Sequence, residues 1–189
     1  TRRITLFPYT TLFRSIYVYE GYAVKQENRL NRDSLKNALE RFNAIYEKYL
    51  SDSKVYMAVV PDKGYYLAEY AGQLSLDYKA LFEVMEAGMP WAQSIDLTAS
   101  LTAGDYYRTD THWRQERLTD IARHLCEVMG TGWFENSELT KKAVDRPFFG
   151  VYYGQAALPM EPETMYYLDN DLLEGCTVYN FETGKTTKI

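Results

Sequence analysis

Residues 54–60, KVYMAVV, form a run that is apolar after its first residue and is followed at once by Pro61. Such a run, bounded by turn residues, is typical of a central β-strand covered on both faces. Proline has no N–H to donate to a neighbouring strand, so we expect the strand to end there. Asp62 and Lys63 then fall at the carboxyl edge of the sheet, where open α/β sheets build their sites.

Helical and strand patterns alternate around this run. Apolar residues that repeat every three or four positions predict helices, and short apolar segments between turn residues predict strands. The expected elements are a hairpin over 16–24 that turns at Gly21, helices over 33–50, 77–87 and 114–129, and strands over 54–60 and 94–97. Asp33 or Ser34 is expected to cap the first helix. The alternation predicts a three-layer α/β domain.

The C-terminal part of the chain has a different character. Residues 146–159 and 164–189 are aromatic, punctuated by glycine and strand-like. We expect a β-rich segment with a hairpin built around Asn170 or Gly175 and a turn at 182–184.

The first fifteen residues, TRRITLFPYTTLFRS, repeat the triplet Thr-Leu-Phe and follow neither a helical nor a strand period. They resemble a translated sequencing adapter, and the alternative is a natural hairpin-like arm. We therefore interpret 1–15 as a non-native segment and 16–189 as an incomplete domain, and leave the former out of the fold argument.

Composition excludes several classes of function. The chain has 189 residues, enough for one domain with a sizeable core, and a net charge of −5 without a lysine or arginine run. A nucleic-acid partner is therefore not expected, because phosphate binding needs a concentrated basic face. No apolar run is long enough to span a membrane. Cys126 and Cys176 could pair or could be small buried apolar residues, with burial favoured for Cys126. The residues show no zinc-ligand spacing, and we expect neither a metal nor a cofactor.

The stretch 105–116, DYYRTDTHWRQE, holds the strongest chemical signal: Asp110 and His112, two residues apart, followed by Trp113. In an extended or turn backbone such side chains project to one side, so the carboxylate can bind one ring nitrogen and leave the other as a base. Trp113 would pack on the pair and limit water. Arg108 would bind an anionic or oxygen-rich substrate, and Tyr107 is a candidate for the same surface.

The same residues have a structural interpretation. Asp110 or Thr111 stands where the helix over 114–129 needs an N-cap, a role that both residue types fill well. The other histidine, His124, lies within that helix beside its apolar face and is interpreted as structural. The residues alone favour capping over an active site.

Three motifs in order, VVPDKGYY, DYYRTDTHWRQE and RPFFGVYYGQAAL, make the chain resemble the DHHW protein family, which is related to the domains of alginate O-acetyltransferases. Thr111 replaces the first histidine of the naming motif, and Asp110 and His112 match. The resemblance implies an SGNH-hydrolase-like, flavodoxin-like fold that acts on O-acyl esters of cell-envelope or exported polysaccharide. It also implies a cell-surface or extracytoplasmic location, with membrane tethering possible through a missing N-terminus. The family has a similar Pro-Asp-Lys, which makes Asp62 and Lys63 candidate supporting residues.

In such a site Asp110 would orient His112, and His112 would deprotonate a serine. A nucleophilic serine needs an exposed tight turn. No serine after the N-terminal segment stands in one: Ser34, Ser51, Ser53, Ser75, Ser94, Ser100 and Ser137. We expect the nucleophile beyond Ile189, so that this fragment alone is inactive. Two alternatives remain: a non-catalytic polysaccharide-binding module that uses its 18 tyrosines, and a structural or docking domain.

Overall fold

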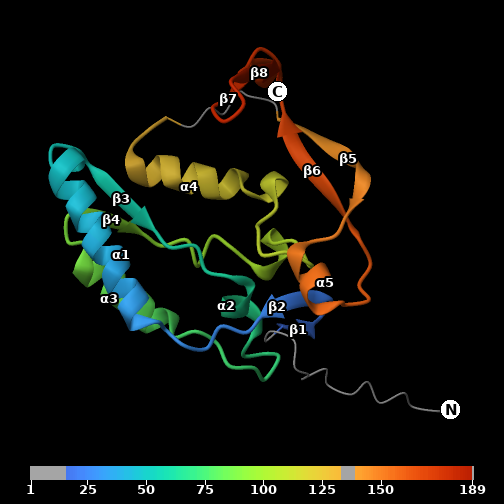
Figure 1. The fold of residues 1–189 in the computed structure, drawn as a ribbon, viewed down its shortest axis with the longest axis horizontal. Coiled ribbons are helices and arrows are strands. Elements are labelled where there is room, and N and C mark those ends of the chain that lie inside the picture. The colour runs from blue at the N-terminus through green and yellow to red at the C-terminus, as the bar shows by residue number, and fades with distance from the viewer. Residues whose placement is uncertain (1–15, 133–138, 189) are drawn as a thin grey trace.

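The computed structural model of the protein describes residues 16–132 and 139–188. Helices and strands are mixed along the described chain (Figure 1). The elements are, in order, β1 (Ile16–Tyr19), β2 (Tyr22–Lys25), α1 (Arg32–Ile45), β3 (Val55–Ala58), α2 (Lys63–Leu67), α3 (Tyr78–Gly88), β4 (Ala92–Ile95), α4 (Thr119–Met129), β5 (Thr140–Phe148), α5 (Val151–Ala156), β6 (Glu163–Asp169), α6 (Asp171–Glu174), β7 (Thr177–Asn180) and β8 (Lys185–Lys188). The expectations for residues 1–15 and Ser137 lie outside the described residues.

The N-terminal hairpin has the predicted form. Strands β1 and β2 pair antiparallel, with Ile16 opposite Lys25. Gly21 has a φ of 80°, which a residue without a Cβ adopts at no steric cost, so the turn falls where glycine was expected to make it. Ala23 on β2 is fully buried, and it packs with Ile16 and with Tyr152 of α5.

Strands β3 and β4 form a parallel pair, with Val55 opposite Ala92, and α3 lies between them in sequence. The predicted order of strand, helix and strand is therefore confirmed. The expectation that β3 is covered on both faces is wrong for the described residues, because Ala58 is exposed and the following Val60 is 44% exposed. Among those residues the pair has no further strand beside it.

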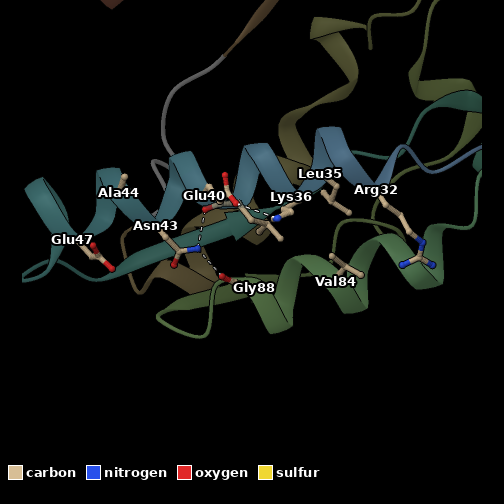
Figure 2. Close-up of a pocket in the computed structure, with 10 residues that line it drawn as sticks. Arg32, Leu35, Lys36, Glu40, Asn43, Ala44, Glu47, Val84 and Gly88 are labelled. Atoms are coloured by element: carbon tan, nitrogen blue, oxygen red, sulfur yellow. Dashed lines mark hydrogen bonds and ion pairs between the residues drawn. The ribbon is translucent and has the colours of Figure 1, made fainter.

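Helices α1 and α3 pack against each other. Leu39 of α1 lies over Gly88 at the end of α3, so closely that a Cβ there would come within 2.6 Å of Leu39. Asn43 donates its side-chain N–H to the Gly88 carbonyl and accepts from the Trp91 indole. A groove lies between these helices (Figure 2). The N-cap of α1 is Asn31, whose Oδ1 accepts from the Ser34 N–H, and not Asp33 or Ser34 as predicted.

Helix α4 packs on the strand pair. Its Ile121 forms an apolar cluster with Ile95, Leu97 and Leu101, and Trp113 packs against this cluster. The helix ends as predicted at Gly130, which has a φ of 67°.

The C-terminal segment is rich in strands, as expected, but its hairpin lies later in the chain. Strand β5 pairs with β6, and β7 pairs with β8 across a turn that contains Gly184. The predicted hairpin around Asn170 or Gly175 is wrong, because Asn170 caps the short helix α6 by accepting from the Leu173 N–H. The predicted turn at 182–184 is confirmed.

Candidate functional site

The stretch singled out in the sequence, residues 105–116, folds as a closed loop. Tyr106 and Trp113 form an isolated antiparallel bridge at its base. The Tyr107 N–H donates to the His112 carbonyl at 3.1 Å, and the Arg114 N–H donates to the Asp105 carbonyl at 2.7 Å. These bonds bring both ends of the loop together and set the backbone between them in a tight turn. We call residues 107–112 the Asp–His loop.

The loop brings Asp110 and His112 into direct contact. Asp110 Oδ1 lies 2.6 Å from His112 Nδ1, and the same oxygen accepts the His112 backbone N–H at 2.9 Å. The other oxygen, Oδ2, accepts the N–H of Val151, the first residue of α5, at 2.8 Å. The Asp110 side chain is 5% exposed, whereas that of His112 is 74% exposed. The carboxylate is thus fixed inside the protein while the far side of the imidazole faces solvent.

The bonds to Asp110 favour its charged form. Burial by itself would raise the pKa of this carboxyl group, but the backbone N–H groups of His112 and Val151 and the His112 ring more than offset it, so the pKa lies below its ordinary value. A carboxylate that stays ionised can accept Nδ1–H from the imidazole throughout the neutral range. That contact leaves Nε2 with a free lone pair when the ring is neutral.

The capping interpretation of Asp110 and Thr111 is wrong. Helix α4 begins at Thr119, after a short 3-10 turn over Gln115–Arg117, and its N-cap residue Leu118 makes no side-chain capping bond. Arg114 has an extended backbone, so the predicted helix cannot start there. Asp110 also differs from a simple cap because it binds the imidazole ring as well as backbone N–H groups.

Three residues that were not predicted hold the loop in place: Thr109 within it, Gly150 just before α5 and Glu163 at the start of β6. Thr109 is fully buried; its Oγ accepts from the Gly150 N–H at 3.0 Å, and its carbonyl accepts from the Tyr152 N–H at 3.0 Å. Gly150 is pressed against the loop, since a Cβ there would lie 2.3 Å from the Thr109 carbonyl oxygen. Glu163, at the start of β6, accepts the Thr109 N–H at 3.1 Å.

Asp62 and Lys63 follow β3, as the sequence predicted, and of the two only Lys63 is hydrogen-bonded to the Asp–His loop. Asp62 accepts the Gly64 N–H and so caps α2. Lys63 is 2% exposed, and its ammonium donates to the carbonyls of Tyr107 and Arg108 at 2.8 and 3.2 Å. Lys63 therefore binds the loop backbone and does not open onto a surface shared with His112. Figure 1 shows α2, β2 and α5 close together around this position.

Of the remaining predicted residues, two pack inside the protein and support the loop, and the third is exposed. Tyr107 is 6% exposed and packs on Phe148, so its ring supports the loop instead of presenting a face to solvent. Trp113 is half-buried against the cluster around Ile95 and anchors the loop to the core. Arg108 lies four residues before His112, and its side chain is 44% exposed. Its Nε lies 3.6 Å from Glu163 Oε1.

Four tyrosine rings pack with one another. Tyr66 contacts the rings of Tyr65 and Tyr106, and Tyr65 also contacts Tyr78. Tyr78 and Tyr106 are buried. Other tyrosines are exposed, among them Tyr49, Tyr70 and Tyr179 at 67%, 77% and 64%, and the polysaccharide-binding alternative stays a prediction.

The described residues contain no group of three or more potential metal ligands. In the same ranges, no helix has the length and apolar character to cross a bilayer. Cys126 is half-buried and Cys176 is exposed, and both are free thiols. The groove between α1 and α3 is lined by none of the residues of the Asp–His loop (Figure 2).

The sequence reasoning missed Thr109, Gly150 and Glu163. Thr109 and Gly150 lie inside two of the motifs that carry the family resemblance, which is the signal that could have found them. Glu163 has no local signal, because its partner lies 54 residues away in the chain.

No protein-family model and no curated protein sequence matches this chain. Comparison of the fold with solved structures gives several matches, which support a mixed α/β domain. The chain is similar to a DHHW family protein from Eubacterium siraeum DSM 15702, with 22% identity, a TM-score of 0.66, and coverage of 82% of this chain and 54% of that one. It is also similar to the O-acetyltransferase domain of Pseudomonas putida AlgJ, with 14% identity, a TM-score of 0.59, and coverage of 84% and 66%.

Bacillus cereus PatB1 gives a further match, with 12% identity, a TM-score of 0.65, and coverage of 92% of this chain and 65% of PatB1. A second PatB1 structure in the same group carries a sulfonyl adduct. The resemblance drawn from the three sequence motifs is therefore confirmed at the level of the fold. The chain spans about half the length of the DHHW protein that it matches.

Proposed function

We propose that this chain carries the Asp–His half of a Ser-His-Asp triad in an SGNH-hydrolase-like domain that transfers or hydrolyses O-acyl groups. One observation carries the proposal: a buried, ionised Asp110 binds His112 Nδ1 at 2.6 Å while the imidazole itself is exposed. An exposed imidazole that is held by a buried carboxylate is the arrangement in which a histidine acts as a general base.

The chemistry follows from the free nitrogen. His112 Nε2 accepts the proton of a serine hydroxyl as that oxygen attacks the acyl carbonyl, and Asp110 stabilises the imidazolium that forms. When the tetrahedral intermediate collapses, the imidazolium returns the proton to the departing sugar oxygen and an acyl-enzyme remains. Attack by water then gives hydrolysis, and attack by a second hydroxyl gives transfer.

The serine is proposed to come from chain that follows Ile189 in the complete protein. Among the described residues, no hydrogen bond joins a serine hydroxyl to His112. The described strand pair β3–β4 would be the beginning of a three-layer, flavodoxin-like sheet that the missing chain completes. Support comes from the similarity in fold to domains whose own chains are longer than this one.

The substrate is proposed to be an acylated carbohydrate of the cell envelope or an exported polysaccharide. The structural neighbours include a protein named as an O-acetyltransferase domain, which supports an acetyl group as the acyl unit. Arg108, whose side chain is partly exposed on the Asp–His loop, is the proposed contact for substrate oxygens. The same reasoning proposes an extracytoplasmic location, with a membrane tether N-terminal to Ile16.

The test uses the complete protein that contains this sequence. Expressed in full, it should release acetate from acetylated polysaccharide or from an aryl acetate, and an aryl sulfonyl fluoride should inactivate it. His112→Gln should lower kcat by about a hundredfold or more, because removing a general base costs rates of that order.

The matched control is the second histidine. His124→Gln, at a half-buried position in the middle of α4, should leave kcat within about twofold, because His124 lies outside the Asp–His loop. A full-length protein that folds, binds polysaccharide and shows no acyl transfer or hydrolysis would overturn the proposal. Equal activity in the two histidine variants would also overturn it.

A further inference from the structure

Two buried side chains of opposite charge form hydrogen bonds to the backbone of the Asp–His loop. Lys63 and Glu163 are both nearly inaccessible to solvent, with exposed fractions of 2% and 7%. They belong to different parts of the fold: Lys63 begins α2 after strand β3, and Glu163 begins β6. Taking two charges out of water is costly, and hydrogen bonds and ion pairs to the buried groups offset that cost. Their partners show what they are used for.

The partners are the peptide groups that lead into Asp110. The Lys63 ammonium donates to two successive carbonyls, those of Tyr107 and Arg108. The Glu163 carboxylate accepts the next N–H along the chain, that of Thr109, and also the Thr109 hydroxyl at 3.3 Å. Lys63 thus binds the carbonyls of residues 107 and 108, and Glu163 Oε2 binds the N–H and hydroxyl of Thr109. The other carboxylate oxygen, Glu163 Oε1, lies 3.6 Å from Arg108 Nε.

Backbone N–H groups of β2 and α5 add two further bonds to this segment. The Arg108 carbonyl also accepts the Ala23 N–H of β2 at 2.7 Å, and the Thr109 carbonyl accepts from Tyr152 of α5. The loop has no regular secondary structure to fix its dihedrals, so its direction depends on these contacts from outside. A shift of about 1 Å in such a loop can lower a catalytic rate by about a hundredfold.

We propose that Lys63 and Glu163 are positioning residues, which together clamp the peptide groups of residues 107–109 and thereby aim the Asp110 carboxylate at the His112 ring. The inference rests on the proposed function only in giving the aimed pair a catalytic use. Lys63 touches neither the reacting atoms nor solvent, so its contribution is made through the loop. Burial lowers the pKa of Lys63 to about 8, against the attraction of Glu163, Asp110 and Asp62, and a neutral amine can still donate to both carbonyls.

The test reads the geometry of the pair directly, in the 189-residue chain with His124→Gln so that a single imidazole remains. The ¹⁵N shifts of the ring report which nitrogen carries the proton. Lys63→Met removes the donor to the Tyr107 carbonyl and leaves the Arg108 carbonyl with the Ala23 N–H alone. We expect the Nδ1–H form of neutral His112 to fall at least twofold. Amide exchange at Thr109 and Val151 should accelerate about tenfold or more. Lys79→Met, exposed on α3, is the matched control and should change neither reading.

A second variant decides the matter if Lys63→Met does not fold. Glu163→Gln keeps the shape of the side chain and removes its charge, and we expect a change in the same direction that is smaller but resolved in both readings. In the complete protein, either variant should lower kcat more than it changes KM. A folded variant with unchanged ring shifts and unchanged exchange at Thr109 and Val151 would overturn the clamp.

The result is separable from that of the proposed function. If the clamp variants disturb the His112 ring while the complete protein transfers no acyl group, the clamp stands and the proposed function fails. If acyl transfer depends on His112 while Lys63→Met leaves the ring and kcat unchanged, the proposed function stands and the clamp fails.

Discussion

The Asp–His loop and the C-terminal hairpin β7–β8 differ in two ways: in regular strand pairing and in burial. The hairpin has paired strands in unbroken register from Thr177 to Lys188, yet both strands are exposed along their whole length. The loop contains no strand or helix, yet Thr109 has no exposed surface and Asp110 is 4% exposed. Regular strand pairing and burial are therefore separate properties in this protein.

The difference lies in where the partners come from. Hairpin residues bond to residues a few positions away, as in the Gly184 N–H that donates to the Asn180 carbonyl. Loop residues bond to side chains and backbone more than forty positions away in α2, α5 and β6. The loop therefore exists only when the rest of the domain has assembled, and changes there should cost far more than similar changes in the hairpin.

The largest expected contrast compares two glycines. Gly150→Ala places a Cβ 2.3 Å from the Thr109 carbonyl oxygen and 2.5 Å from the Asp110 Cβ, so the loop must move; we expect a loss of about 3 kcal/mol in the free energy of unfolding. Gly184→Ala meets no atom within 4 Å and strains only a φ of 64°, so we expect about 1 kcal/mol. Urea unfolding of both variants measures the contrast, and equal losses would break it.

The next contrast is a dependence on pH that Lys63, buried against the loop, should add and that the exposed hairpin β7–β8 should not. Because the pKa of Lys63 is about 8 in the folded protein and the ordinary lysine value is 10.5, the unfolded chain holds this proton over a range in which the folded chain has lost it. Stability then rises with pH between the two values, and we expect Lys63 to add about 2 kcal/mol from pH 8 to pH 10.

The control for this titration is Lys63→Met, which should remove that rise without changing the pH dependence below pH 7. The measurement is the free energy of unfolding in urea at successive pH values. If the free energy of unfolding of the wild-type protein fell from pH 8 to pH 9 as steeply as that of the variant, the lowered pKa of Lys63 would be contradicted.

The smallest contrast uses two threonines. Thr109→Val leaves the Gly150 N–H without its acceptor in a fully buried place, and we expect a loss of about 1.5 kcal/mol. Thr186→Val on exposed β8 should change stability by less than about 0.5 kcal/mol. Thermal unfolding of the two variants provides the comparison, and a larger loss for Thr186→Val would reverse it.

The same division explains what the sequence could predict. Periodicity located α1, α3 and the strands β1 to β4 to within a few residues, but it missed the short helix α2. The two-residue spacing of Asp110 and His112 anticipated their contact. These are local properties. The start of α4 was missed because a 3-10 turn intervenes, and Asn170 was read as a turn because capping and turning use the same residue type.

The long-range contacts that support the loop lay beyond sequence reasoning, although two of the residues involved lie inside the family motifs. Thr109, Gly150 and Glu163 look like an ordinary strand residue, turn glycine and surface acid in the printed sequence. They become a unit only because β6 and α5 come to lie beside the loop, at separations of 41 to 54 residues. Lys63 was noticed for its place after a strand, and its burial beneath the loop could not be read from that place.

The central claim is that Asp110 holds the proton of neutral His112 on Nδ1 and leaves Nε2 free. The ¹⁵N shifts of the ring, measured in the His124→Gln chain with and without Asp110→Ala, test it most directly. The structure predicts the Nδ1–H form when Asp110 is present and the Nε2–H form, which free imidazole side chains prefer, when it is absent. An Nε2–H ring in the presence of Asp110 would contradict the account.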